Sequence, residues 1–347
     1  MTRFLRRILS TLLVLFAVVS ATFFVSQVLP SDPARLVAGP QARPKDVERI
    51  RLQLGLDRPV LVQYTSYLRR LVHVSTESGA SLDLAAAPPS EAHKNCGTLG
   101  PVHFDLGRSY QMRRPVAVLI AERFPRSIAL AIAALFVQLL VGLGLALWGT
   151  LTPNGRVDRA LYRGSAVGLS VPTFVLGIVL QYIFAYRLAW LPIDGFGETF
   201  LARAHAIVLP ALTLGIYGGI GFYRMARSEL QNALGEDYAR SARAKGAART
   251  RVVLVHALRN AAIPLVTVIA LDLGTLIGGA VVTESLFRWP GVAALSVSAL
   301  LDRDGPLLLG TVLVTSIAIV LSNLFADSLY SIVDPRMRGK ERAVTGR

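Results

Sequence analysis

The chain has 347 residues, of which 53% are hydrophobic and only 17% are charged, and its formal net charge is +15 at pH 7. A soluble domain carries about 25% charged residues. With a mean hydropathy of +0.50, this balance indicates a bilayer protein and excludes intrinsic disorder, which requires few apolar residues and much charge. The single cysteine, Cys96, excludes a disulfide framework and a cysteine-only zinc site within the chain.

Six long runs with little or no charge follow one another along the chain and predict transmembrane helices. They cover residues 8–31, 127–155, 164–186, 204–223, 260–283 and 305–326. Each run reaches the roughly 20 residues that a helix needs to cross about 30 Å of hydrocarbon. The runs lack the alternation of barrel strands, so helices are the structure that satisfies their backbone in lipid. The predicted fold class is an all-α polytopic membrane protein with six transmembrane helices. The first run exceeds the 7–15 apolar residues of a signal peptide, so we expect it to be retained.

Lysine and arginine predict the orientation of these helices. If the N-terminus lies inside, nineteen Lys and Arg residues fall in cytoplasmic segments and four fall in the two short outer loops. The positive-inside rule therefore predicts that both termini are cytoplasmic. The expected organisation is an N-terminus with the first span (1–29), an external mixed segment (30–126), a five-helix core (127–332) that contains a cytoplasmic segment (224–260), and a cytoplasmic tail (333–347).

The external segment contains two helix-like stretches, at residues 46–54 and 60–72, and a Ser/Ala/Pro-rich patch at 75–89 that is typical of a flexible insertion. Three histidines and the cysteine flank this patch within 31 residues of the external segment: His73, His93, Cys96 and His103. Their spacing fits no zinc signature, so we predict no metal site.

The cytoplasmic segment has a helix–glycine–helix pattern. Alanine, arginine and lysine favour a helix up to Lys245, and the acidic Glu236 and Asp237 lie near its N-terminal end, where the helix dipole favours them. Gly246 then breaks or bends the chain, and a second helical stretch begins near Thr250. A solvated loop that merely obeys the positive-inside rule would account for the same arginines.

This segment also resembles a known family. Arg240, Ser241 and Ala242, followed after three residues by Gly246, resemble the EAA-type loop of ABC importer permeases, in the version found in dipeptide and oligopeptide permeases. Further segments resemble the family in collinear order: 29–33 (LPSDP), 105–109 (DLGRS), 170–174 (SVPTF), 209–214 (LPALTL), 284–291 (ESLFRWPG) and 334–336 (DPR). The chain departs from the general EAA pattern in having Arg240 and Ser241 for its Glu and first Ala, and residues 75–103 look like an insertion.

The resemblance implies the permease subunit of an ATP-driven importer for di- or oligopeptides, in the inner membrane of a bacterium. The EAA-type loop of such a permease would place a short coupling helix in a cleft on a cytoplasmic ATPase. The implied partners are a second homologous permease, two ATP-binding subunits and an extracytoplasmic substrate-binding protein. The coupling positions carried over from the family are Arg240, Ser241, Ala242, Arg243 and Gly246.

Several chemistries have no motif in this sequence. No G-x-x-x-x-G-K-[ST] phosphate loop is present, so ATP and Mg are expected on a partner ATPase and no cofactor is expected in this chain. Nucleophile-elbow, H-E-x-x-H and paired-cysteine motifs are also missing, which argues against an enzyme. No basic stripe with interleaved aromatics predicts nucleic-acid binding.

Asp272 is the one acidic residue deep within a predicted span. An intramembrane carboxylate suggests a translocation path. The alternative, which the sequence favours, is a hydrogen-bonded helix contact near Gly274, where small residues allow close packing. Gln138 and Gln181 lie mid-membrane as well and are candidates either for the path or for ordinary interhelical hydrogen bonds.

Three alternative functions remain open at this point. Nickel and glutathione permeases share the motifs quoted above. A proton-coupled secondary transporter would need an ion site, for which Asp272 is the one candidate. A membrane-anchored scaffold would show no substrate-dependent activity.

Overall fold

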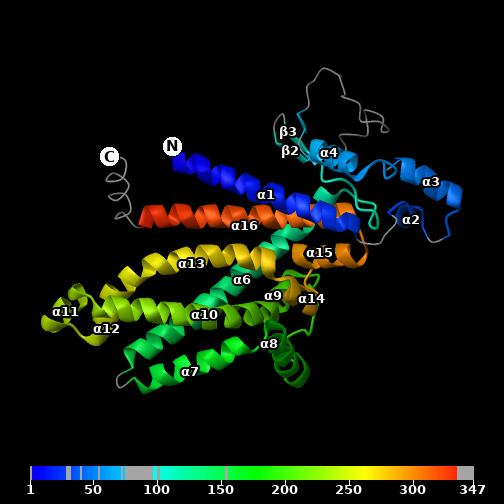
Figure 1. Cartoon of the computed structure of the whole chain (residues 1–347). Helices are drawn as coiled ribbons and strands as arrows, with labels where there is room; N and C mark the ends of the chain where they lie inside the picture. Colours follow the sequence, from blue (N-terminus) through cyan, green and yellow to red (C-terminus); the bar gives the residue numbers. More distant parts are fainter. Residues whose placement is uncertain are drawn as a thin grey trace. The chain divides into compact units, whose positions relative to one another are not determined.

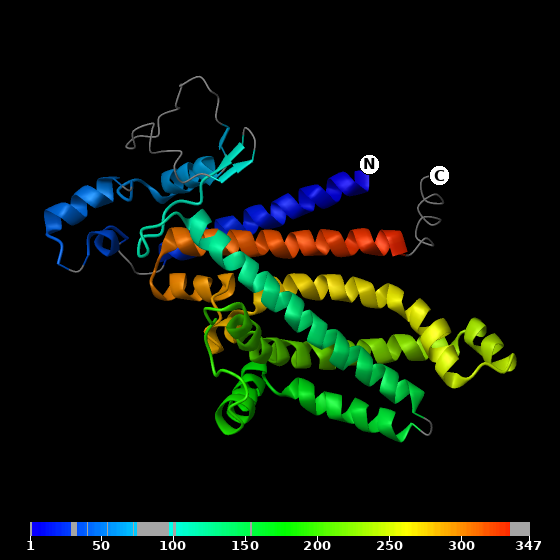
Figure 2. The ribbon, with the colours of Figure 1, turned by 180° about the vertical axis from the view of Figure 1, so that it is seen from behind.

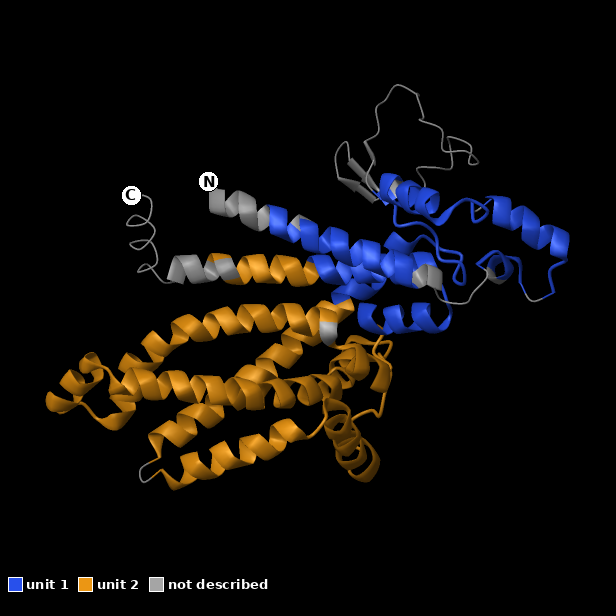
Figure 3. Cartoon of the chain, viewed as in Figure 1, with its two compact units in different colours: residues 1–125, 291–317 blue, residues 126–290, 318–347 orange. Residues whose placement is uncertain are grey.

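A computed structural model describes most of the chain (Figure 1). The described residues are 2–28, 33–39, 41–53, 55–71, 73–74, 97–99, 102–152 and 155–333. The chain forms two compact units (Figure 3): unit 1 comprises residues 1–125 and 291–317, and unit 2 comprises residues 126–290 and 318–347.

Unit 1 contains the first helix, the predicted external segment and the start of the last helix. Its elements are α1 (Thr2–Val28), α2 (Pro33–Ala38), α3 (Pro44–Gln53), α4 (Val60–Leu71), β1 (His73–Val74), β2 (Gly97–Leu99), β3 (Val102–Phe104), the start of α6 (Val116–Leu151), α15 (Val292–Leu301) and the start of α16 (Gly305–Val333). Helices α3 and α4 occupy the two stretches expected to be helical.

The three short strands, which the sequence analysis did not predict, form an antiparallel sheet in the order β1-β3-β2, with His73 opposite His103. Most of the expected insertion lies outside the described residues, as do His93 and Cys96.

Helix α4 packs against α1 through aromatic rings. Phe23 of α1, only 5% exposed, stacks on Tyr67 with ring centroids 5.6 Å apart and also contacts Tyr64 at 5.2 Å. The Tyr64 hydroxyl is 2.5 Å from the hydroxyl of Ser20. Burial raises the pKa of Tyr67 to about 12.

The start of α16 is fixed by a buried carboxylate. Asp304 is 1% exposed and accepts hydrogen bonds from the Ser109 hydroxyl (2.6 Å) and from the backbone N–H groups of Gln111 (3.1 Å) and Leu307 (3.3 Å). It therefore satisfies one of the free N–H groups at a helix N-terminus. Ser109 belongs to the DLGRS segment, which explains why that segment is held against the α16 start. Apolar residues of α6, α15 and α16 surround it as one core: Val116, Leu119, Ile120, Val292, Leu295, Ala299 and Leu307.

Unit 2 is a helical bundle arranged around one long helix. Its elements are α6 from Arg126 onward, α7 (Arg156–Ser170), α8 (Thr173–Leu180), η1 (Gln181–Arg187), α9 (Phe200–Ala206), α10 (Val208–Gly235), α11 (Asp237–Ala244), α12 (Arg249–Arg251), η2 (Val252–Ala257), α13 (Leu258–Gly279), α14 (Val281–Leu286) and the end of α16. Helix α10 contacts α7, α8 and α13, as Figures 1 and 2 show from opposite sides.

Small residues let the helices of unit 2 approach closely. A Cβ atom on Gly142 of α6 would lie 2.7 Å from the carbonyl oxygen of Gly219 on α10, and a Cβ on Gly274 of α13 would lie 2.6 Å from the Cβ of Ser322 on α16. Lipid is as apolar as leucine, so close packing of this kind drives helix association in a bilayer.

Four helical stretches among the described residues are long and apolar enough to cross a membrane: Val116–Leu151, Phe200–Gly235, Arg249–Gly278 and Gly305–Ala326. A fifth span results if α7 and the α8–η1 segment are counted together, although they are bent by 98°. Within α1, the apolar stretch Leu9–Val25 is shorter. The fold is thus that of a helical membrane protein, while the six-span count and the orientation stay predictions.

The run at 164–186 differs from the single straight helix that was expected. Helix α7 ends before Pro172, and Val171 has the extended conformation (φ −82°, ψ 122°). Proline clashes with a helical residue before it, so the SVPTF segment bends the chain there.

Candidate coupling site

Helix α11 presents most of the residues expected to couple the chain to an ATPase. Asp237 lies in its first turn, where the helix dipole favours a negative charge. Ala239 is fully buried and anchors one face of the helix. Partial burial and the nearby Glu236 carboxylate raise the pKa of Tyr238. The side chains of Arg240, Ser241, Arg243 and Lys245 are exposed, and Ala242 is half-buried.

Gly246 ends α11 in a left-handed conformation with a φ of +79°. Its N–H donates to the carbonyl of Arg243 at 2.9 Å, and the N–H of Ala247 donates to the carbonyl of Ala242 at 3.1 Å. This pair of bonds is the Schellman motif, which requires a residue tolerant of positive φ at this position. No atom lies within 4 Å of the position of a Cβ on Gly246, so the backbone conformation, and not space, demands glycine.

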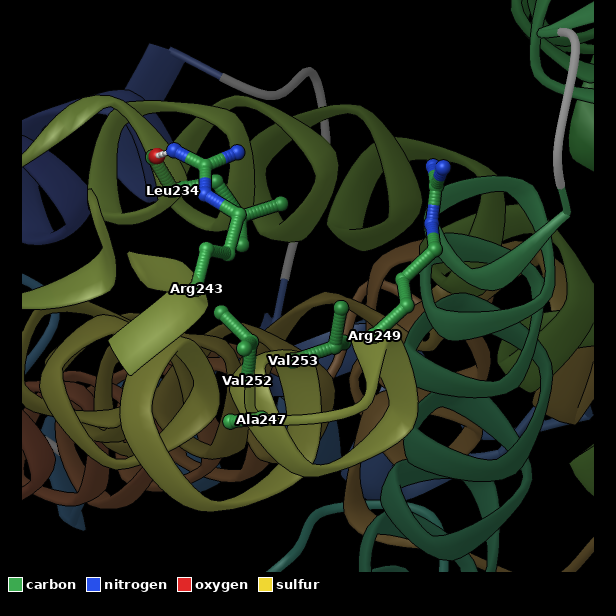
Figure 4. Close-up of a pocket in the computed structure, with 6 residues that line it drawn as sticks. All are labelled: Leu234, Arg243, Ala247, Arg249, Val252 and Val253. Carbon is green, nitrogen blue, oxygen red and sulfur yellow. Dashed lines mark hydrogen bonds between the residues drawn. The ribbon is translucent and has the colours of Figure 1, made fainter. Parts of the chain in front are cut away.

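Arg243 connects α11 to the end of α10. Its Nη2 donates to the carbonyl of Leu234 at 3.0 Å, one residue before α10 ends. A cation is favoured there because the last helix carbonyls lack intrahelical donors and carry the negative end of the dipole. Figure 4 shows this bond at the rim of a pocket of about 380 Å³, lined by Leu234, Arg243, Ala247, Arg249, Val252 and Val253.

Two further arginines join the helix ends near this pocket. The guanidinium of Arg249 donates twice to the carbonyl of Thr150 in the last turn of α6, from Nε at 3.1 Å and from Nη2 at 2.7 Å. Arg227 of α10 makes a two-bond ion pair with Asp158 of α7, at 2.5 and 2.6 Å, and also stacks on Tyr162. Arg249 thereby ties the end of α6 to the segment that follows α11, and Arg227 ties the start of α7 to α10.

The candidate coupling segment, residues 236–260, continues into α13 through a π-helical turn, η2. The N–H of Leu258 donates to the carbonyl of Val253, five residues earlier, in place of the usual four. Val252, Val253 and Ala257 are buried, and η2 contacts both α10 and α11. Such turns are rare inside helices and frequently occur at functional sites.

Two of the three polar candidates for the translocation path lie together. Gln138 of α6 is 2% exposed, and its Nε2 donates to Oδ2 of the half-buried Asp272 on α13 at 2.5 Å. A Cβ on Gly218 of α10 would lie 2.5 Å from Oε1 of Gln138, so three helices meet here. Gln181 is not part of this group: its Nε2 donates to the carbonyl of Ile193 at 2.9 Å.

A buried glutamate was not among the residues predicted from the sequence. Glu284 of α14 is fully buried and accepts a hydrogen bond from Ser127 of α6 at 2.7 Å. The sequence gives only a weak indication that Glu284 is buried. It directly follows the uncharged end of the fifth run, at 260–283, and so marks the boundary of that run.

An aromatic and cationic cluster lies beside this glutamate. Indole Nε1 of Trp289 donates to the carbonyl of Arg126 at 3.1 Å. The rings of Phe196 and Trp289 meet edge to face at 5.0 Å, and the guanidinium groups of Arg126 and Arg203 lie 4.6 and 4.9 Å from the Phe196 ring centre. Cation–π contacts of this kind join Arg126, the first α6 residue of unit 2, to the chain between η1 and α10.

Two family models together match nearly the whole chain. Residues 138–339 match the family described as binding-protein-dependent transport system inner membrane component. Residues 1–131 match the N-terminal family of the same membrane components. The chain belongs to this permease family. It is therefore an inner-membrane ABC transporter permease, and the family works with ATPase partners and a substrate-binding protein.

Curated relatives agree along almost the full length of the permease. A putative peptide transport system permease protein of Brucella abortus (strain 2308) is 36% identical over 338 residues, covering 96% of this chain and 98% of the relative. The glutathione transport system permease protein GsiC of Salmonella typhimurium (strain LT2) is 36% identical over 336 residues, covering 97% and 98%. An inward-facing structure of the MetNI methionine ABC transporter shares the fold, with a TM-score of 0.53 and 18% identity over 63% of this chain and 98% of that one.

Proposed function

We propose that this permease imports di- or oligopeptides and that α11 is the coupling helix that docks on the partner ATPase. The observation that carries the coupling role is the two-sidedness of α11. Its buried Ala239 and the Arg243–Leu234 bond fix it to the permease, while Arg240 and Ser241 remain exposed for a partner. A short helix fixed in this way moves as a unit with the chain on either side of it.

The proposed assembly contains a second, related permease, two ATP-binding subunits and an extracytoplasmic binding protein. ATP and Mg would be bound by the ATPase subunits, since this chain lacks a phosphate-binding loop. ATP-driven closure of those subunits would displace α11 and switch the permease between its outward- and inward-open states.

Peptides are the first substrate class to test because a full-length relative is named for peptide transport. Glutathione, itself a small peptide, is the second candidate because the equally similar GsiC is named for it. Uptake by the reconstituted complex with its binding protein separates the two. Transport of mixed di- and tripeptides without glutathione supports the first class, and glutathione transport alone supports the second.

The residues proposed for the translocation path are Asp272, Gln138 and Gln181. Support comes from the first two, which form a polar pair between α6 and α13 within a bundle that is otherwise largely apolar. A helix contact of this kind can separate when the bundle opens, whereas Gln181 bonds only a loop carbonyl among the described residues.

The substitution Gly246→Pro tests the coupling role. Proline fixes φ near −65° and lacks an N–H, so it cannot adopt the φ of +79° or donate to Arg243. We expect the complex to assemble and hydrolyse ATP while peptide uptake in proteoliposomes is lost. Gly246→Asn is the matched control, because asparagine tolerates positive φ, and it should retain most uptake. Unchanged uptake by the proline variant would contradict the proposal.

A further inference from the structure

Arg249 forms a specific attachment between the coupling segment and α6. It is the first residue of α12, three positions after Gly246, and both of its hydrogen bonds go to one carbonyl, that of Thr150. Only a guanidinium has the rigid, planar set of donors for this arrangement. Figure 4 shows Arg249 on the side of the pocket opposite Arg243; Arg243 belongs to α11 and Arg249 to α12, on either side of the turn at Gly246.

The far end of this attachment leads to the polar pair in the bundle. Thr150 and Gln138 are on the same helix, twelve residues apart, which corresponds to about 18 Å along a helix axis. Gln138 in turn donates to Asp272 of α13. Helix α13 is also reached directly from α11, through α12 and η2. The coupling segment is therefore joined to both members of the pair, to one through Arg249 and to the other through the π-turn.

We propose that Arg249 is a positioning residue for transport: it makes the cytoplasmic end of α6 follow α11, so that α6 and α13 shift together when the ATPase moves the coupling helix. This inference rests on the proposed function of α11. Without Arg249, α11 would keep its connection to α13 through η2 but would lose the direct hydrogen bonds between this segment and the end of α6, so α6 would follow α13 less closely at the Gln138–Asp272 pair.

The fold does not depend on Arg249 alone at this face of the molecule. Asp158 and Arg227 tie α7 to α10, and Arg243 ties α11 to α10. In addition, Asp158 packs beside the α6 end, because a Cβ on Gly149 would lie 3.2 Å from its Oδ1. Loss of the Arg249 bonds is therefore expected to change coupling and leave assembly intact.

The test compares Arg249→Gln and Arg249→Lys in the reconstituted complex, with peptide uptake and ATP hydrolysis measured on the same vesicles. We expect the glutamine variant to assemble with normal ATP hydrolysis and to lose at least about fivefold in peptide transported per ATP, the lower end of typical coupling strengths. Lysine keeps the charge but not the two-pronged geometry, so it should restore the ratio only in part.

Arg251→Gln is the matched control. Arg251 lies on the same turn, is exposed, and makes no side-chain hydrogen bond or ion pair within the described part of the chain. It should keep the wild-type ratio of peptide transported per ATP.

An unchanged ratio of transport to ATP hydrolysis in Arg249→Gln overturns the proposal. Full restoration of that ratio by lysine overturns it in favour of a simple charge effect. A variant that fails to assemble or melts markedly lower also overturns it, because Arg249 would then only hold the fold. If Gly246→Pro uncouples while Arg249→Gln does not, the coupling role of α11 stands and this inference fails alone.

Discussion

At the scale of single residues, the polar groups of this permease are placed where apolar helices must be held in register. Glu284 is fully buried and accepts a hydrogen bond from Ser127 on another helix, and Asp272 likewise accepts one from Gln138. Burying a carboxylate is costly unless it is hydrogen-bonded, so each group selects one arrangement of its two helices.

Substitutions at Asp272 separate a hydrogen-bonding role from a proton-carrying one. Asp272→Asn keeps an oxygen that can accept the bond from Gln138 but removes the titratable charge, so we expect uptake to persist at every external pH. Asp272→Ala leaves the buried Gln138 amide without that acceptor, which costs about 1–3 kcal/mol. Melting temperature in detergent and uptake in proteoliposomes measure the two effects.

The double variant Asp272→Ala with Gln138→Leu is the control for this pair. Replacing both partners by apolar groups removes the unsatisfied amide, so much of the lost stability should return. If Asp272→Asn abolished uptake, or made it insensitive to pH where the wild type responds, the proton-coupled alternative would gain support.

At the scale of elements, helix starts and ends carry the long-range connections. Asp304 fixes the N-terminus of α16 to the DLGRS segment through Ser109. Arg243 and Arg249 fix the C-terminal turns of α10 and α6. Both choices of charge agree with the helix dipole, which favours anions at N-termini and cations at C-termini.

Ser109→Ala should destabilise the junction between α15 and α16. The change removes the hydroxyl that donates to the buried Asp304 and accepts from the N–H of Met112. Leaving a buried acceptor short of a donor costs about 1–3 kcal/mol, so we expect a lower melting temperature.

Ser296→Ala provides the comparison for that change, because among the described residues its hydroxyl donates only to a carbonyl of its own helix, that of Val292. This variant should melt close to the wild type. Equal melting temperatures for the two variants would show that the Ser109–Asp304 bond adds little stability.

At the scale of the whole molecule, the orientation in the membrane decides which face meets the ATPase. The arginine distribution predicts cytoplasmic termini and places residues 30–126 outside. It also places α11 inside, where a cytoplasmic ATPase can reach it. These two placements are linked. In the six-helix arrangement three spans lie between residues 30–126 and α11, so the two must be on opposite sides of the membrane.

The single cysteine makes this prediction directly measurable. A membrane-impermeant maleimide added to right-side-out vesicles should label Cys96 of the wild type. The Cys96→Ser, Lys245→Cys variant should be labelled only after the vesicles are inverted or made permeable, because Lys245 is exposed at the end of α11. Labelling of both positions from the same side would contradict the predicted arrangement.

Much of the fold could be predicted from sequence because its strongest determinant is local. A run such as 305–326 specifies a helix in lipid through its own backbone hydrogen bonds, whatever surrounds it. The Gly246 break was predictable for the same reason. The partners of Asp272 and Arg249 were not, because Gln138 and Thr150 lie 134 and 99 residues away along the chain.

The sequence by itself determined that this chain is a helical membrane protein with a helix–glycine–helix segment, and its collinear motifs resemble those of ABC importer permeases. Local hydrogen bonding and the exclusion of charge from hydrocarbon are sufficient for the first of these conclusions, whereas the permease assignment depends on the resemblance. Only the tertiary structure decided that the third run bends at Pro172, that η2 is a π-turn, and that Glu284 is buried against Ser127. These features depend on which helices pack together and in what register, and helix packing is set by contacts between residues far apart in sequence.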